Sequence, residues 1–369
     1  MLWGFFISKA SHRRIGDILK KEGFVYSDRD VASLLQGNQK GVRYGNTVLP
    51  RNEGGAQQKR FIKIVLDGKW KTYRLFKRQV KITAALHDDK KYTFPTMAVI
   101  RYSLMPPVPY AIFETREDGD GFGFMHDSPA FYERFTEADM QQLVGVMYAF
   151  HRAGFTVEAS TLKLTRPLSS KISFYKIEFE ELLDTKITHK TKEGQEMTKS
   201  VEELLVSYTG MEDIRLRIMQ MLERCFTEVE ASKTSKGFYL VHADMQIDNV
   251  YKHTNGDFEL LDFEWVGRAD NPVIAILFDY GNLRARAWSS PSFQQMLDKI
   301  MFEEGAKIYP NSAEMIRSAL TLGSLRSSLM MSRFHLDVIN TVKKDKRTEE
   351  NYHAMYPKTV AALKQVLKS

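Results

Sequence analysis

The segment YLVHADMQIDNVYKHTNGDFELLDFEW, residues 239–265, decides the fold of this chain. An apolar strand end leads to Asp244, and Asn249 follows five residues later. A second short strand then reaches an Asn-Gly pair, which is typical of a tight turn between two strands. The returning strand ends at Asp262. The turn therefore predicts that Asp244, Asn249 and Asp262 gather near one end of a hairpin.

These three side chains together predict phosphoryl-transfer chemistry. Two carboxylates and an amide oxygen are hard ligands, which suit Mg²⁺ and bind zinc poorly. Phosphoryl transfer uses one aspartate to orient and deprotonate the attacking hydroxyl, and other oxygen ligands to hold the metal against the phosphates. Each residue alone has a simpler structural explanation, such as a loop hydrogen bond or a strand-end cap. Their combined spacing favours the chemistry.

The pattern H-x-D-x-x-x-x-N, followed thirteen residues after the Asn by D-F-E, resembles a known family. It is similar to the catalytic and metal-binding segments of the aminoglycoside phosphotransferase and choline kinase-like superfamily. The downstream Asp270-Asn271-Pro272 and Asp279-Tyr280 also resemble that family's pattern. Protein kinases normally carry D-F-G and A-P-E, and this chain lacks both. The small-molecule kinases are therefore the better match.

The resemblance implies an α+β, protein-kinase-like fold with a strand-rich N-terminal lobe and a mostly helical C-terminal lobe. It also implies ATP or GTP as donor, Mg²⁺ as cofactor, and a small-molecule hydroxyl as acceptor. By the same resemblance Asp244 matches the catalytic base, while Asn249 and Asp262 match the metal ligands. His242 matches the histidine that supports the catalytic loop.

Lys63 is the one charge inside the apolar strand FIKIV, and a buried lysine needs a partner or a ligand. The resemblance implies that Lys63 contacts the α- and β-phosphates of the nucleotide. The family usually pairs this lysine with a glutamate from the next helix, but the matching position here is Gln79. Gln79 can form a hydrogen bond with Lys63 but cannot neutralise it, so we expect Lys63 either to be held by a carboxylate from outside the helix, such as Asp262, or to be mobile until nucleotide arrives. Two further departures are Ala243, where the family often has glycine, and a loose Gly-rich loop near 37–55.

The order of elements predicts two lobes. Residues 1–117 are expected to form the nucleotide-binding lobe, with a helical extension over 1–36, strands at 42–49, 60–67, 97–104 and 110–115, and a helix at 72–89. The acidic, Gly-rich residues 118–124 are expected to form a hinge. Residues 125–369 are expected to form the helical catalytic and acceptor-binding lobe. Its predicted helices are 136–154, 173–185, 200–208, 211–230 and the tail from 291, with a loose polar excursion at 187–200.

Charge is uneven along the chain, which carries +7 overall. Residues 1–117 hold 22 cationic and 10 anionic side chains, and the remainder holds 31 and 36. A basic front part suits an anionic ligand. Nucleic acid would suit it too, but the sequence shows no aromatic–basic motif of the common modules, so nucleic acid is not expected as a partner.

Composition limits the other possibilities. The 43% hydrophobic and 27% charged residues are those of an ordinary globular chain. The lone Cys225 lies among apolar residues and is expected to be a core thiol. No apolar run is long enough to span a bilayer, and the protein is expected to be cytoplasmic. Besides a small-molecule kinase, two hypotheses stay open: a degenerate kinase fold that binds nucleotide or scaffolds a partner, and a nucleic-acid-associated protein.

Overall fold

The structure is a computed structural model of the chain. It describes residues 11–36, 44–88, 92, 96–105, 108–115, 119–121, 132–190, 196–232, 237–287, 290–341, 360–361 and 363–368. The chain divides into two compact units. The first unit contains Met1–Asp120, Val157–Thr165 and Tyr251–Val266, and the second contains Gly121–Thr156, Arg166–Val250 and Gly267–Ser369. Each unit is described by itself.

A four-stranded antiparallel sheet forms the centre of the first unit. Its strands are β1 (Tyr44–Glu53), β2 (Ala56–Val65), β3 (Val99–Ser103) and β4 (Tyr110–Glu114), in the order β1-β2-β4-β3. The turn between β1 and β2 is two glycines, both with φ in the left-handed region that glycine adopts without strain. β1 is ten residues long and so extends beyond the predicted strand.

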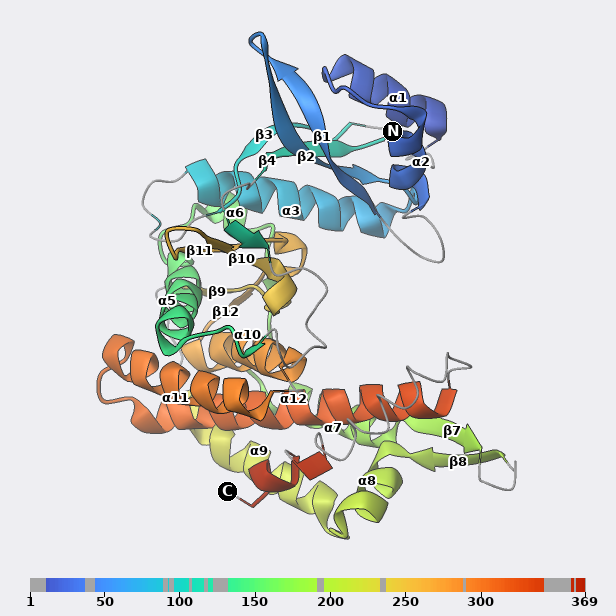
Figure 1. Cartoon of the computed structure of the whole chain (residues 1–369). Coiled ribbons are helices and arrows are strands. Elements are labelled where there is room, and N and C mark those ends of the chain that lie inside the picture. The colour runs from blue at the N-terminus through green and yellow to red at the C-terminus, as the bar shows by residue number, and fades with distance from the viewer. Residues whose placement is uncertain are drawn as a thin grey trace, which may run out of the picture. The chain divides into compact units, whose positions relative to one another are not determined.

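Helices cover both faces of this sheet, as Figure 1 shows. Helices α1 (His12–Lys21) and α2 (Asp28–Gln36) share one apolar cluster with Ile62 and Ile64 of β2. Helix α3 (Trp70–Asp88) shares the other cluster with Val65. Successive strand residues point to opposite faces. Lys63 therefore lies on the face that α3 covers.

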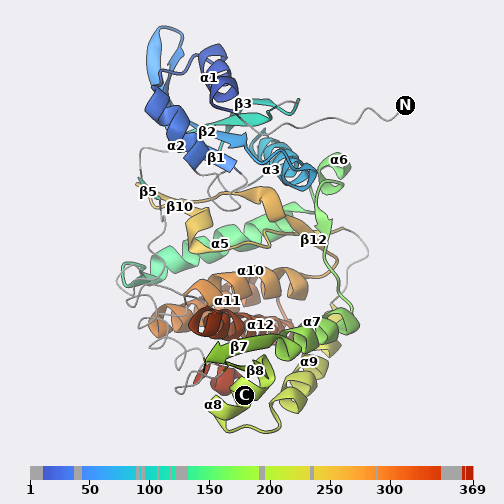
Figure 2. The same ribbon diagram turned by 90° about the vertical axis from the view of Figure 1, so that its right-hand side faces the viewer.

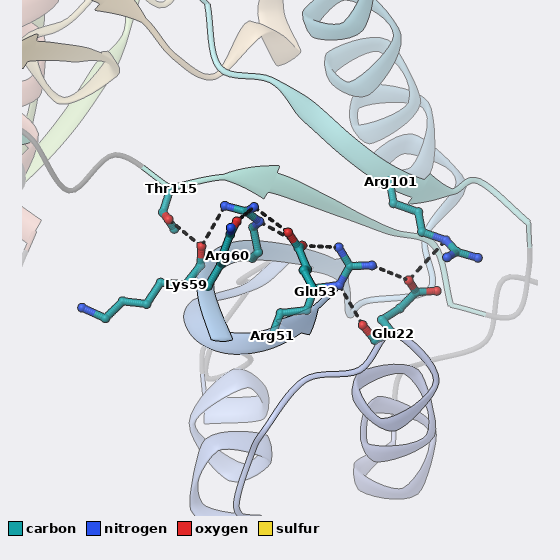
Figure 3. Close-up of polar contacts among 8 residues, drawn as sticks. Glu22, Arg51, Glu53, Lys59, Arg60, Arg101 and Thr115 are labelled. Carbon is teal, nitrogen blue, oxygen red and sulfur yellow. Dashed lines mark hydrogen bonds and ion pairs between the residues drawn. The ribbon is translucent and has the colours of Figure 1, made fainter. Parts of the chain in front are cut away.

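A polar network joins the helical extension to the edge of the sheet (Figure 3). Glu22 follows α1, and its side chain is fully buried. Its carboxylate accepts a hydrogen bond from the hydroxyl of Tyr110 and lies 3.2 Å from Nε of Arg101 and 3.7 Å from Arg51. Arg51 Nε also donates to the backbone oxygen of Glu22 at 2.7 Å. Burial, and then the bond to Glu22, raises the pKa of Tyr110 to about 12.

The same network continues to a more exposed carboxylate, Glu53. Arg51 Nη1 and Arg60 Nη2 each donate to Glu53 at 2.6 Å. The hydrogen bond from Arg60 is the main reason that the pKa of Glu53 is lowered, with a smaller contribution from Arg51. The chain Glu22–Arg51–Glu53–Arg60 thus fixes α1 to strands β1 and β2.

Replacing Glu22 tests how much this network stabilises the first unit. Glu22→Ala leaves a buried hydroxyl and a largely buried guanidinium without their partner, so the free energy of unfolding should fall by about 3 kcal/mol. Glu53→Ala is the matched control, because its carboxylate is partly exposed and should cost about 1 kcal/mol or less. Urea denaturation measures both. Equal losses for the two variants would contradict the assigned role of the buried carboxylate.

The second unit is mostly helical. Its helices are α5 (Glu137–Ala153), α7 (Ile172–Asp184), α8 (Val201–Thr209), α9 (Ile214–Ala231), α10 (Pro272–Arg286), α11 (Pro291–Ile308) and α12 (Ala313–Thr341). Helices α10 and α12 cross at Gly281 and Gly323 (Figures 1 and 2). A Cβ at Gly323 would meet the ring of Tyr280 at 2.6 Å, so this crossing requires glycine.

Short strands complete the chain. A three-stranded sheet of β6 (Arg166–Pro167), β12 (Gly267–Ala269) and β9 (Tyr239–Val241) lies in the second unit. Strands β5 (Gly119–Gly121), β10 (Val250–His253) and β11 (Phe258–Leu260) form another sheet. The first unit also contains the short helix α6 (Ala159–Leu162). Among the described residues, no helix is long and apolar enough to cross a membrane.

Most predicted elements are present, and one is wrong. The polar stretch 187–200 was expected to be a loose excursion, but it contains the antiparallel pair β7 (Lys186–Lys190) and β8 (Glu196–Ser200). Cross-strand contacts such as the hydroxyl pair Thr188–Thr198 replace the apolar alternation that sequence reasoning looks for. Cys225 is buried, as expected, and burial raises the pKa of its thiol. Most of 118–124 lies outside the described residues, so the hinge and lobe boundaries stay predictions.

Candidate functional site

The predicted catalytic loop follows β9 in the second unit. His242 is fully buried, and its ring lies 6.1 Å from that of Phe150. Ala243 has φ of 61°, a left-handed conformation that costs a residue with a Cβ about 1–2 kcal/mol. The loop then closes with the 3₁₀ turn η1 (Ile247–Asn249). Ala243 adopts a conformation that glycine would adopt without strain, so the surrounding contacts must hold it.

Asp279 of α10 supplies those contacts. Its carboxylate accepts the backbone N–H of His242 at 2.9 Å and that of Ala243 at 2.8 Å. His151 Nε2 of α5 lies 2.9 Å from the same carboxylate, and both side chains are fully buried. Asn282, one helical turn further along α10, donates to the backbone oxygen of Ala243 at 3.0 Å. Helix α10 thus holds the strained turn by hydrogen bonds to both the backbone N–H and the backbone oxygen of Ala243.

This support orients the next residue, Asp244. One carboxylate oxygen of Asp244 accepts from Gln246 at 3.3 Å, and the other accepts from the amide nitrogen of Asn249 at 3.3 Å. The same amide nitrogen donates to the backbone oxygen of Asp244 at 2.8 Å. With both bonds made by its nitrogen, the amide of Asn249 keeps its oxygen for a ligand. The second unit therefore brings together His242, Asp244 and Asn249.

The first unit brings together the other three predicted residues. Lys63 is only 6% exposed, and its ammonium lies 2.8 Å from the side-chain oxygen of Gln79. It also lies 3.2 Å from the carboxylate of Asp262. Both partners that the sequence left open for Lys63 are thus present. The ring of Tyr44 completes the surroundings, with the ammonium 4.4 Å from its centroid.

Asp262 stands between β11 and the 3₁₀ turn η2 (Phe263–Trp265). Its φ of 56° is again left-handed, and such strain persists only where neighbouring structure fixes it. Arg78 of α3 donates to the backbone oxygen of Glu264 at 3.4 Å, which joins η2 to the helix that carries Gln79. The side chain of Asp262 is 34% exposed, so one of its oxygens can face a ligand while the other faces Lys63.

The available donors fit magnesium better than a soft metal. The amide oxygen of Asn249 and the carboxylate of Asp262 are hard oxygen ligands, and Mg²⁺ is commonly held by one or two carboxylates plus substrate phosphates. Over the described part of the chain, no three His, Cys, Asp or Glu side chains gather as a metal site would require. A metal at either residue would therefore depend on further oxygens, such as those of a nucleotide.

Sequence reasoning missed Tyr44 and Asn282. Tyr44 lies within the Gly-rich stretch near 37–55 and gives no signal until the strand register is known. His151 also supports the loop, through its fully buried contact with Asp279. Asp279 was noted only for its resemblance. The buried contact between His151 of α5 and Asp279 of α10 connects two helices whose residues are more than 100 positions apart in the sequence.

Comparison with solved structures gives the fold. The crystal structure of a spectinomycin phosphotransferase in complex with ADP and spectinomycin is similar at a TM-score of 0.51 and 12% identity, over 95% of this chain and 97% of that one. The chain therefore has the same fold as this phosphotransferase, the two-lobe α+β fold that was expected from the sequence. Lys63 lies on a strand of the first unit, and Asp244 follows a strand of the mostly helical second unit.

Two further solved structures are similar at a TM-score of 0.49. A choline kinase from Streptococcus pneumoniae is 13% identical, over 96% of this chain and 99% of that one. An ethanolamine kinase from Plasmodium vivax is 13% identical, over 98% of this chain and 95% of that one. No family model and no curated protein matches the chain.

Tyr44 gives a test of how Lys63 is held. A desolvated cation–π contact contributes about 2 kcal/mol, so Tyr44→Leu should weaken nucleotide binding up to about 30-fold. Tyr44→Phe keeps the ring and should bind nucleotide as the original chain does. Adding Gln79→Glu to Tyr44→Leu should restore much of the affinity, because a carboxylate would then orient the ammonium. Calorimetric titration measures all three. Equal affinity for Tyr44→Leu and Tyr44→Phe would refute the contribution of the ring.

Proposed function

We propose that this protein is an ATP- or GTP-dependent, Mg²⁺-dependent phosphotransferase that moves the γ-phosphate to a hydroxyl of a small molecule. The observation that carries the proposal is the surroundings of Lys63, a buried cation that faces Gln79 and Asp262. A lysine so placed is not needed to stabilise a strand, because burying a charge is costly. Its position is instead suited to phosphate oxygens.

Asp244 has the position of a general base. Its carboxylate follows a rigid turn and is oriented by Gln246 and Asn249. A carboxylate in this position would orient the acceptor hydroxyl and take its proton as the oxygen attacks phosphorus. Asp279 would act on the reaction only through the backbone of His242 and Ala243, which makes it a positioning residue.

Asn249 and Asp262 would hold Mg²⁺ through hard oxygens. The metal, when bound, would neutralise charge that develops on the phosphates. Lys63 would then exchange part of its contact with Asp262 for the α- and β-phosphates. Gln79 would keep the ammonium in place during this exchange, since its oxygen accepts a hydrogen bond without neutralising the charge.

The similar solved structures support the same class of reaction. Those proteins are named as a spectinomycin phosphotransferase, a choline kinase and an ethanolamine kinase, and the first was solved with ADP and spectinomycin. The identity of the acceptor does not follow from these names. A degenerate fold that binds nucleotide without turnover is the second candidate, and the amide at Gln79 is the observation that favours it.

Asp244→Asn separates the two candidates. The substitution keeps the shape of the side chain and removes the base, so acceptor-dependent ADP release should fall at least about 100-fold. Nucleotide affinity and thermal stability should stay the same. Asp248→Asn makes the same change four residues away and serves as the matched control. An acceptor panel with Mg²⁺ provides the assay. Undiminished turnover in Asp244→Asn, with a normal control, would refute its role as base.

Asp262→Ala tests the metal. A carboxylate that carries Mg²⁺ matters chiefly when the metal is present, so nucleotide affinity should fall more with Mg²⁺ than without it. Without metal the loss should be small, because Lys63 then gains freedom to meet phosphate. Calorimetry with Mg²⁺ and with EDTA compares the two conditions. Equal losses in both would contradict the assignment of Asp262 as a metal ligand.

A further inference from the structure

The solvent-facing side of α3 is made almost entirely of cations and aromatic rings. Between Gly68 and His87 the chain has six cationic side chains and no Asp or Glu. The apolar residues of α3 face the sheet and η2 and are buried. Its remaining long side chains lie at helical spacing along the other side: Trp70, Lys71, Tyr73, Arg74, Lys77, Arg78 and Lys81.

In the part of the chain that the structure describes, four of these five cations have no acidic partner. Arg78 contacts the backbone oxygen of Glu264. Within the described residues, Lys71, Arg74, Lys77 and Lys81 have no ion-pair partner, and all but Lys77 are exposed. A helix surface that only needs to be soluble mixes both signs, because like charges at i,i+4 destabilise a helix. Arg74, Lys77, Arg78 and Lys81 repeat every three to four residues, which is about 5.4 Å per turn along the helix.

The aromatic pair lies at the start of the same face. Trp70 and Tyr73 are one helical turn apart, and their rings stack with centroids 5.0 Å apart and planes at 29°. Trp70 is 56% exposed, so much of its indole is open to solvent. An exposed ring beside a row of cations is the arrangement that proteins use to stack a base while they contact the phosphates that follow.

We infer that this cationic face of α3 is a binding surface for single-stranded nucleic acid. Arg74, Lys77 and Lys81 would contact successive phosphates, and Trp70, supported by Tyr73, would stack on one base. An anionic membrane is the less suitable occupant. Membrane-surface helices insert leucine, phenylalanine or similar side chains, whereas this face offers only the two rings and alanines as apolar surface. The charge of the surface and its exposed ring together favour the nucleic acid.

The inference revises one expectation from the sequence. Nucleic acid was not expected because the sequence shows no aromatic–basic motif of the common modules. The segment WKTYRLFKRQVK, residues 70–81, is not such a motif when read as a linear sequence. On a helix, however, its apolar residues turn inward and its aromatic and basic residues share the outer side. This surface is independent of the proposed phosphotransfer, since it contains none of the residues assigned to that reaction.

Binding of a fluorescent single-stranded 20-mer, followed by anisotropy at several salt concentrations, tests the inference. Micromolar affinity is expected at low salt, and log K should fall with log salt at a slope of about −2 to −3, as three to four phosphate contacts predict. The double substitution R74E/K81E should weaken binding more than tenfold and make this slope smaller by about 1.4. Both residues are exposed, and an unchanged melting temperature would show that the variant folds.

A matched control separates this surface from net charge. K20E/K21E reverses two exposed cations of α1 in the same unit, makes the same change in total charge, and should alter affinity less than twofold. Equal loss in both double variants would overturn the inference, because general electrostatic attraction would then explain the binding.

The ring and the kind of anion are tested separately. Trp70→Ala should weaken binding about tenfold and Trp70→Phe much less, as loss of a base stack predicts. Equal affinity in both variants would overturn the stacking. Vesicles containing anionic lipid, and polyglutamate of equal charge number, should compete poorly with the oligonucleotide. Tighter binding of either one than of the oligonucleotide would overturn nucleic acid as the partner.

Discussion

The buried charge of Lys63 is the constraint on which the first unit depends. A lysine in the middle of an apolar strand costs several kcal/mol unless polar groups surround the ammonium. Strand alternation directs Lys63 towards α3, and α3 meets it with Gln79 rather than with another apolar residue. The left-handed turn at Asp262 brings a carboxylate to the same point. The sheet, α3 and the end of β11 are therefore positioned around one cation.

A second buried charge has the corresponding role in the second unit. Asp279 has no exposed surface, and its carboxylate is satisfied by two backbone N–H groups and by His151. These contacts hold Ala243 in a conformation that costs about 1–2 kcal/mol. In both units a strained residue adjoins or forms part of the proposed site, as is common where surrounding structure fixes a functional side chain. Local strain and buried charge thus coincide with the residues that the proposed chemistry requires.

The sequence predicted the parts of this arrangement that depend on local pattern. The strand around Lys63, the helix with Gln79 and the hairpin with Asp262 all follow from periodicity and turn residues. The fold class follows from the motif around Asp244. The pairing of β7 with β8 could not be predicted, because its polar residues show no apolar alternation.

Contacts between segments far apart in the sequence explain why the roles of other residues could not be predicted. Tyr44 reaches Lys63 only because of the register between β1 and β2, in which Asn46 is opposite Lys63. Glu22 follows a helix whose sequence suggests that it is exposed. The structure buries its carboxylate instead, against a tyrosine and two arginines from three different strands. The cationic face of α3 could not be predicted for the same reason. The order of its residues suggests an ordinary charged helix. Only the burial of its apolar residues shows that its aromatic and cationic residues share the exposed side.

Nucleotide binding by Lys63→Met measures the central claim most directly. Methionine fills the same volume without a charge, so the sheet and α3 should keep their packing and the melting temperature should not fall. If Lys63 is buried in order to meet phosphates, calorimetry should show ATP affinity reduced at least tenfold in the variant, with and without Mg²⁺. Unchanged ATP affinity in a stably folded Lys63→Met variant would contradict the account, because the buried ammonium would then have no part in binding phosphate.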